Sequence, residues 1–149
     1  MQWHLAQVNI GTLRAPTDSP VVAEFMDALD EINALAESSP GFIWRMQDDS
    51  GNATSIRGPW RSDILANMSV WETVEDLERF VYETAHGPYV KRRKEWFKPL
   101  GGRFMALWWI PAGTQPTLAE AKDRLDVLSE KGVTAEAFTM RKSFPPPNG

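Results

Sequence analysis

The chain has 149 residues, of which 42% are hydrophobic and 24% are charged, and this composition is ordinary for one globular domain. A formal net charge of -4 disfavours a general role in nucleic-acid binding, and the absence of cysteine excludes disulfides, thiolate metal sites and cysteine nucleophiles. No apolar run approaches the roughly 20 residues of a membrane span, and the N-terminus lacks a signal-peptide pattern. We therefore expect a cytoplasmic protein that has neither a membrane nor nucleic acid as a partner.

The N-terminal region predicts a strand followed by a helix. Residues Trp3 to Ile10 alternate with the period of a strand, which places Asn9 on the same face as Gln7. A loop is expected over Gly11 to Pro20. Apolar residues then recur with helical spacing and predict a helix over Val21 to Ala36.

A second strand is predicted over Phe42 to Gln47. Strict alternation assigns its side chains to two faces, which are Phe42, Trp44 and Met46 on one and Ile43, Arg45 and Gln47 on the other. The polar stretch Asp48 to Asp63 contains glycine and proline and predicts a long loop, of the kind that often carries function.

The next stretch predicts a strand that runs into a helix. Leu65 to Trp71 alternates with the strand period, and Asn67 and Trp71 share one face. Thr73 has the context of a helix N-cap because acidic residues follow it in the first turn. This strand and the end of its helix are where we expect a site.

His86 lies at the end of that helix. Gly87 and Pro88 interrupt the helix, and a second helix would place Tyr89, Arg93, Trp96 and Phe97 on one face. An imidazole at this junction can take a proton near neutral pH or bind haem iron, and it can also simply cap the helix end. An arginine beside aromatic rings can clamp a carboxylate or form a salt bridge.

The C-terminal third predicts a strand and a helix. Arg103 to Ile110 is apolar on both faces, which is typical of a central or interface strand. A helix is expected from Pro116 to about Lys131, where Gly132 ends it. A short edge strand is expected over Ala137 to Phe144.

The element order is β-α-β-β-α-β, followed by an extra helix and a short strand. We therefore expect one α+β domain of the ferredoxin-like class over residues 1–144, with a tail over residues 145–149. An antiparallel sheet with helices on one face leaves its other face uncovered. Burial of that face against a second copy predicts a homodimer through the sheet.

The amino-acid sequence resembles that of one family over nearly its whole length. The segments PGFIWRMQ, GNAT, NMSVWETVEDLERFVY, KRRKEWF, LWWIPAG and AEAFTMRKSF look like the DUF3291 family. That resemblance implies a dimeric α+β barrel and brings no activity with it.

A second, weaker resemblance is to the antibiotic-biosynthesis-type and haem-degrading monooxygenases of the same barrel superfamily. Those proteins have an Asn on the first strand, a Val-Trp pair near the end of the third strand and, in the haem-degrading group, a His on the next helix that binds iron. Asn9, Val70-Trp71 and His86 follow in that order, although His86 lies about a helix turn beyond the expected place and precedes Gly87-Pro88. The resemblance implies a monooxygenase with haem or with no cofactor.

Two functions stay open at this point. In the first, a pocket between sheet and helices binds a flat, largely apolar or aromatic small molecule and oxygenates it; His86, Asn9 and Trp71 would be its catalytic residues. The ligand-binding residues would be Arg93, Asn67, Tyr89, Trp96 and Trp44, and His86 would be a metal ligand only if haem binds. In the second, the chain is a non-catalytic binding or interaction protein, and the same aromatic residues form its core and dimer interface.

Overall fold

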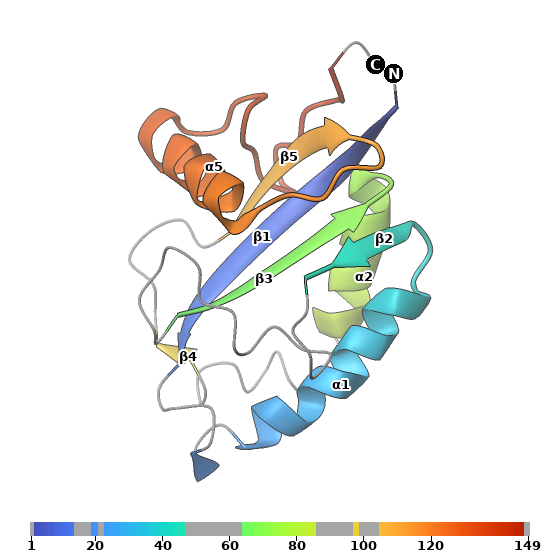
Figure 1. Ribbon diagram of the computed structural model, residues 1–149, viewed down its shortest axis with the longest axis vertical. Coiled ribbons are helices and arrows are strands. Elements are labelled where there is room, and N and C mark those ends of the chain that lie inside the picture. Colours follow the sequence, from blue (N-terminus) through green and yellow to red (C-terminus); the bar gives the residue numbers. More distant parts are fainter. Residues whose placement is uncertain are drawn as a thin grey trace.

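The main strands and helices of the described chain follow the predicted order β-α-β-β-α-β-α, with one additional two-residue strand at Phe97–Lys98. The computed structural model describes residues 2–13, 19–20, 23–46, 64–85, 97–98 and 105–147. Its elements are β1 Trp3–Leu13, α1 Ala23–Ser38, β2 Phe42–Arg45, β3 Ile64–Trp71, α2 Val74–Ala85, β4 Phe97–Lys98, β5 Met105–Pro111 and α5 Leu118–Lys131. Figure 1 shows how the long central strand β1 crosses the molecule between the helices.

The strand order confirms the predicted fold class. β1 pairs antiparallel with β3 along one edge and with β5 along the other, and the short β4 continues this second edge beside Thr12 and Leu13. β2 pairs antiparallel with β3, so the long strands lie in the order β2-β3-β1-β5 (Figure 1). This order, with antiparallel pairing throughout, is that of a ferredoxin-like α+β fold.

Helices pack on both faces of the sheet. The face that we call the α1/α2 face is covered by side chains of α1 and α2, and the α5 face is covered by α5. The core of the α1/α2 face contains Leu5, Ala36, Trp71, Val74, Leu77 and Leu107. The core of the α5 face contains Val8, Met68, Val70, Trp108, Ala121, Leu125 and Leu128. Trp108 and Trp109 point to opposite faces, as expected for a strand that is apolar on both faces.

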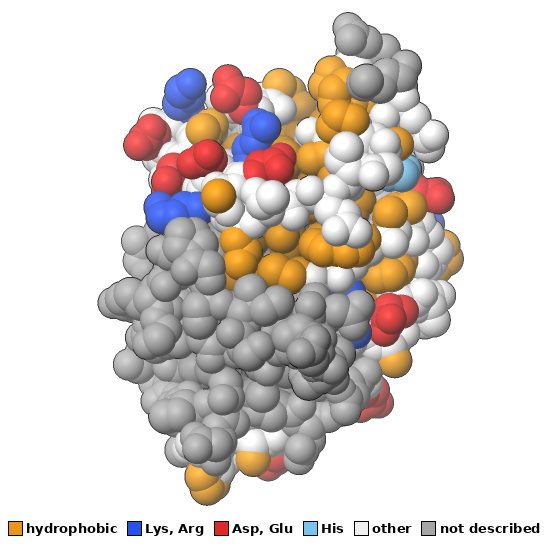
Figure 2. Space-filling view, viewed as in Figure 1, with side chains coloured by type: hydrophobic (Ala, Val, Ile, Leu, Met, Phe, Trp, Pro, Cys, Tyr) orange, Lys and Arg blue, Asp and Glu red, His pale blue; other side chains and the backbone are white. Residues whose placement is uncertain are grey.

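The α5 face is not left open, which corrects the premise of the dimer prediction. Its sheet residues Ala6, Val8, Met68, Val70, Ala106 and Trp108 are all buried within one chain. The outer surface of α5 carries acidic and basic side chains together, as Figure 2 shows, including an ion pair of 2.9 Å between Lys122 and Asp126. An uncovered apolar face therefore no longer argues for a homodimer, which stays a prediction.

A β-bulge in β2 overturns the predicted assignment of its side chains. Phe42 pairs with Trp71 and Trp44 pairs with Val70, so the pairing register shifts by one residue between them. Ile43 is the extra residue, and it is 40% exposed. Phe42 therefore packs on the α1/α2 face, whereas Trp44 and Met46 pack on the α5 face. The bulge also turns Arg45 to the α1/α2 face, because Arg45 pairs with Ser69.

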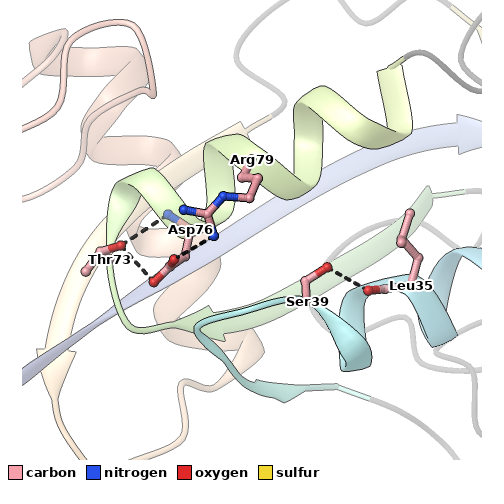
Figure 3. Close-up of polar contacts among 5 residues, drawn as sticks. All are labelled: Leu35, Ser39, Thr73, Asp76 and Arg79. Carbon is pink, nitrogen blue, oxygen red and sulfur yellow. Dashed lines mark hydrogen bonds and ion pairs between the residues drawn. The ribbon is translucent and has the colours of Figure 1, made fainter.

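The N-terminus of α2 is fastened to the turn before β2. Thr73 caps α2 as predicted: its Oγ1 accepts the Asp76 backbone N–H at 3.1 Å and donates to the Asp76 carboxylate at 2.9 Å. Arg79 donates to the same carboxylate at 3.2 Å, as Figure 3 shows beside the Ser39–Leu35 bond at the end of α1. Gly41 accepts the Glu72 N–H at 2.8 Å, which joins the two elements.

Several predicted boundaries are shifted. β1 continues through Gly11 to Leu13, where a loop was expected. Phe97 lies in the short strand β4 rather than on a helix. β5 is not a central strand but lies at the sheet edge beside β1, where its other edge is met only at Phe138 among the described residues; its expected role as an interface strand stays a prediction. Beyond Gly132, which ends α5 as predicted, the expected strand over 137–144 is reduced to isolated bridges.

No helix within the described ranges is both long enough and apolar enough to cross a membrane.

Candidate functional site

Five side chains of β1 and β3 form one hydrogen-bonded row on the α1/α2 face. We call this set the amide row; its members are Gln7, Asn9, Asn67, Ser69 and Trp71. The antiparallel register places Gln7 opposite Ser69 and Asn9 opposite Asn67. Because directly opposed residues of neighbouring strands share one face, the register itself brings these polar side chains together.

The inner end of the row is closed. The Trp71 Nε1–H donates to Ser69 Oγ at 2.9 Å, and Gln7 Nε2 donates to the same oxygen at 2.7 Å. These two bonds occupy both acceptor positions of the hydroxyl. Trp71 is completely buried, and Gln7 and Ser69 are also buried. A polar pair on a buried sheet face is stable only when it is hydrogen-bonded in this way.

The outer end of the row reaches solvent. Gln7 Nε2 also donates to Asn67 Oδ1 at 3.0 Å. Asn9 Nδ2 donates to Gln7 Oε1 at 3.1 Å and to Asn67 Oδ1 at 3.3 Å. Asn9 is partly exposed and Asn67 is exposed. The row therefore runs from the buried indole of Trp71 to an accessible pair of asparagines.

The two asparagines end the row with unused hydrogen-bonding groups. Both N–H groups of Asn9 and both acceptor positions of the Asn67 oxygen are taken within the row. Among the described residues, neither Asn9 Oδ1 nor Asn67 Nδ2 has a partner. The accessible end thus presents one carbonyl oxygen and one NH₂ group side by side.

This result does not depend on which way the amides point. Rotating all three amides by 180° exchanges oxygen and nitrogen, and every contact again joins a donor to an acceptor, with the Ser69 hydroxyl now donating to Gln7. The Gln7–Ser69 separation of 2.7 Å is well suited to an O–H···O bond. One oxygen and one NH₂ group remain unused in either arrangement, on exchanged residues.

Trp71 supports the row from the core. Its ring stacks on Phe80 at 5.2 Å between ring centroids and meets Phe42 edge-on at 5.6 Å. The indole is completely buried, and its bond to Ser69 is its only hydrogen bond to the other members of the row. This bond fixes the position of the Ser69 hydroxyl.

Arg45 lies on the same face, next to the row. It pairs with Ser69 across β2 and β3, and its side chain is only 10% exposed. Its Nη2 contacts the half-exposed Glu37 carboxylate of α1 at 3.4 Å, which is a long contact for an ion pair. Its buried Nε has no hydrogen-bond partner among the residues that the structure describes.

The structure brings together three of the predicted site residues. Asn9, Asn67 and Trp71 are joined through Gln7 and Ser69. Trp44 is not among them, because it packs on the opposite, α5 face. The other predicted site residues, His86, Tyr89, Arg93 and Trp96, lie outside the described residues.

Sequence reasoning missed three members of this site. Gln7 and Ser69 have the right signal, since each alternates with predicted site residues on its own strand. Their importance follows from the register, which a strand pattern alone does not give. Arg45 was assigned to the wrong face because the sequence carries no signal for the bulge at Ile43.

Comparison with known proteins gives a family and distant structural likenesses. The structure of SnoaB, a cofactor-independent oxygenase from Streptomyces nogalater, is 17% identical with a TM-score of 0.48, and the match covers 77% of this chain and 96% of that one. An uncharacterized NIPSNAP-like domain protein from Burkholderia xenovorans is 18% identical with a TM-score of 0.42, over 77% and 90% of the two chains. A comparison with curated proteins found no match. The model of the family described as "Domain of unknown function (DUF3291)" matches residues 4–149, so the chain belongs to the DUF3291 family.

Proposed function

We propose that this protein binds a flat, largely apolar small molecule at the outer end of the amide row. The observation that carries the proposal is that the Asn9 carbonyl oxygen and the Asn67 NH₂ group have no partner among the described residues, at the end of a network whose other amide N–H groups are paired. A ligand edge with a donor beside an acceptor, such as a hydroxyl next to a carbonyl group, would pair both. A ligand that covers the two amides and completes their hydrogen bonds would be favoured over one that leaves either group unpaired.

The neighbouring side chains suit a flat apolar body. Leu107 lies opposite Gln7 on the β5 side of the row and is fully buried, so Met105, which lies opposite Asn9 and is partly buried, is the apolar side chain that a ligand could reach. A few polar groups set among apolar side chains are the usual composition of a small-molecule site. The row would orient the ligand, and the apolar residues would contribute burial.

Oxygenation without a cofactor is the chemistry that we propose for such a ligand. A CH₂ group conjugated to a hydroxyl and a carbonyl would lose two hydrogens and gain one atom of O₂, while the other oxygen atom leaves as water. The substrate supplies the electrons, and the amide N–H groups would stabilise negative charge on its oxygen. Haem does not fit the amide row, because amides and a hydroxyl are not the axial ligands that haem iron takes. A haem site would have to rest on His86, outside the described residues.

Binding without catalysis is the second candidate, and one observation favours it. None of the five side chains of the amide row is an acid or a base near neutral pH. The row can orient a ligand, but it cannot by itself remove a proton from it. If the protein binds without catalysis, the ligand is recovered unchanged after incubation with it.

Ligand binding by Asn67→Leu tests the proposal. Wild type should be stabilised against heat by a naphthalene that carries adjacent hydroxyl and carbonyl groups, and less by its O-methyl ether, which has lost the donor. Asn67→Leu should be stabilised less than wild type by both compounds, because it removes one of the two groups that pair with the ligand edge. Gln115→Leu, which replaces an exposed amide before α5, is the matched control and should behave as wild type. Equal stabilisation of wild type and Asn67→Leu would contradict the proposal.

Oxygen consumption separates the two candidate functions. Incubation of protein in air with a fused-ring compound that carries the same hydroxyl and carbonyl groups together with a conjugated CH₂ group should consume one O₂ per molecule oxidised if the protein is an oxygenase. A compound that binds but is recovered unchanged, with no O₂ uptake, would leave the binding function alone.

A further inference from the structure

The guanidinium of Arg45 has a buried nitrogen that lacks a hydrogen-bond partner among the described residues. Its side chain is nine-tenths buried, and its only hydrogen-bond contact among the described residues is the 3.4 Å approach of Nη2 to Glu37. Nε is closed off from solvent and has no hydrogen-bond partner in the described part of the chain. Buried polar groups are nearly always paired, and one that is not calls for a missing partner.

The missing partner should be an acceptor with negative charge. Arginine stays protonated throughout the physiological range, and its Nε–H and Nη–H groups form a planar fork that matches the two oxygens of a carboxylate. Glu37 occupies only one prong of that fork and is half exposed. A second carboxylate could displace Glu37 and take both prongs.

The position of Arg45 relates it to the amide row. Arg45 is directly opposite Ser69, and Asn67 is two residues along the same strand, so Arg45 and Asn67 are diagonal neighbours on one face. Diagonal neighbours in an antiparallel pair are about 7–8 Å apart, which is the scale of one or two fused aromatic rings. One flat molecule could therefore reach both.

We propose that Arg45 is the acid-binding residue of the site, and that the ligand carries a carboxylate across a flat ring system from the oxygen that contacts Asn9 and Asn67. This inference rests on the proposed small-molecule site and adds the charge and the span of its ligand. The acid-binding arginine would then be Arg45 in β2. The sequence pattern had indicated Arg93 for this role.

Glu37 has a defined part in this arrangement. Its carboxylate competes with the ligand for Nη2 of Arg45, and the length of the present contact shows how weakly it holds that position. Replacing Glu37 by glutamine removes the competing negative charge and keeps the shape of the side chain. A purely structural Arg45–Glu37 pair predicts no effect of this change on ligand binding.

Nuclear magnetic resonance of the full chain provides the test. The probes are 6-hydroxy-2-naphthoate and its methyl ester, which differ in charge but hardly in shape. The acid should bind wild type about tenfold more tightly than the ester, since a hydrogen bond to a charged group contributes about a factor of ten or more. The Arg45 Nε–H resonance should shift with the acid and not with the ester.

The variants make the assignment specific. Arg45→Met should bind the acid no better than the ester, and Arg45→Lys should recover only part of the preference because it lacks the fork. Glu37→Gln should bind the acid severalfold more tightly than wild type. Asn67→Leu should weaken both probes and retain the preference for the acid.

The outcomes separate this inference from the function on which it rests. Equal affinity of acid and ester for wild type, with shifts at Asn9 and Asn67, would overturn the role of Arg45 and leave the proposed site standing. An acid preference that survives in Arg45→Met would overturn it as well. If neither probe shifts any resonance of the amide row or of Arg45 at millimolar concentration, both the inference and the proposed site are wrong.

Discussion

Gly41 is the residue at which the turn before β2 touches the start of α2. Its φ of +82° lies in the region that favours glycine, and a Cβ built there would collide with the carboxylate of Asp76. That carboxylate is already held by Thr73 and Arg79, so it has little room to move. The site depends on this turn, because the turn leads directly into β2 and so to Arg45.

We expect Gly41→Ala to destabilise the protein by about 2–4 kcal/mol, from backbone strain together with the displacement of Asp76. Gly113→Ala is the matched control, since Gly113 has a φ of +90° and open space around its Cβ position. It should lose only about 1 kcal/mol, the cost of the backbone conformation. Urea unfolding of both variants checks this; equal losses would show that the contact with Asp76 does not matter.

We expect Arg45 to lower the free energy of unfolding of the ligand-free protein. Its buried Nε–H lacks a partner, and its long contact with a half-exposed Glu37 contributes little in return. We expect Arg45→Met to raise the free energy of unfolding of the ligand-free protein by about 1 kcal/mol, because it removes an unpaired buried donor and keeps the volume. Denaturant titration at unchanged m-value is the measurement, and a loss of stability would show that Arg45 has a structural role.

At the scale of elements, the periodicity of the sequence predicted the secondary structure of most segments. It did not predict how the strands pair or in which register. The Thr73 cap and the end of α5 at Gly132 could both be predicted, because helix ends are local properties of a sequence. The bulge at Ile43 could not, because it arises from the pairing of β2 with β3. The joining of Gln7 to Ser69 also depends on register, which is fixed by contacts between distant segments.

The bulge in β2 predicts that the protein tolerates deletion of Ile43. Ile43 is the extra residue of β2, so its removal leaves Phe42, Trp44 and Arg45 on the faces that they now occupy. We expect the protein without Ile43 to fold and to keep the Arg45 Nε–H resonance in a folded spectrum. Removal of Val70 from the regularly paired β3 is the control. It should prevent folding, because it turns one part of the strand over relative to the other.

At the scale of the whole molecule, α5 changes the case for self-association. The predicted homodimer was to bury a bare sheet face, but α5 already packs on Val8, Val70 and Trp108 within one chain. The homodimer remains a prediction that sedimentation equilibrium can check. A two-chain mass, with a melting temperature that rises with protein concentration, would confirm it. A one-chain mass at all concentrations would contradict it.

The reversible direction of the amide row has a consequence for tautomers. A keto form and its enol exchange a donor for an acceptor at the same position, and the three amides can follow that exchange by rotating together. The row would then hold both tautomers with the same number of hydrogen bonds and would not discriminate between them. A ligand could change tautomer while bound, and the protein would select it by its shape and by the charge that faces Arg45.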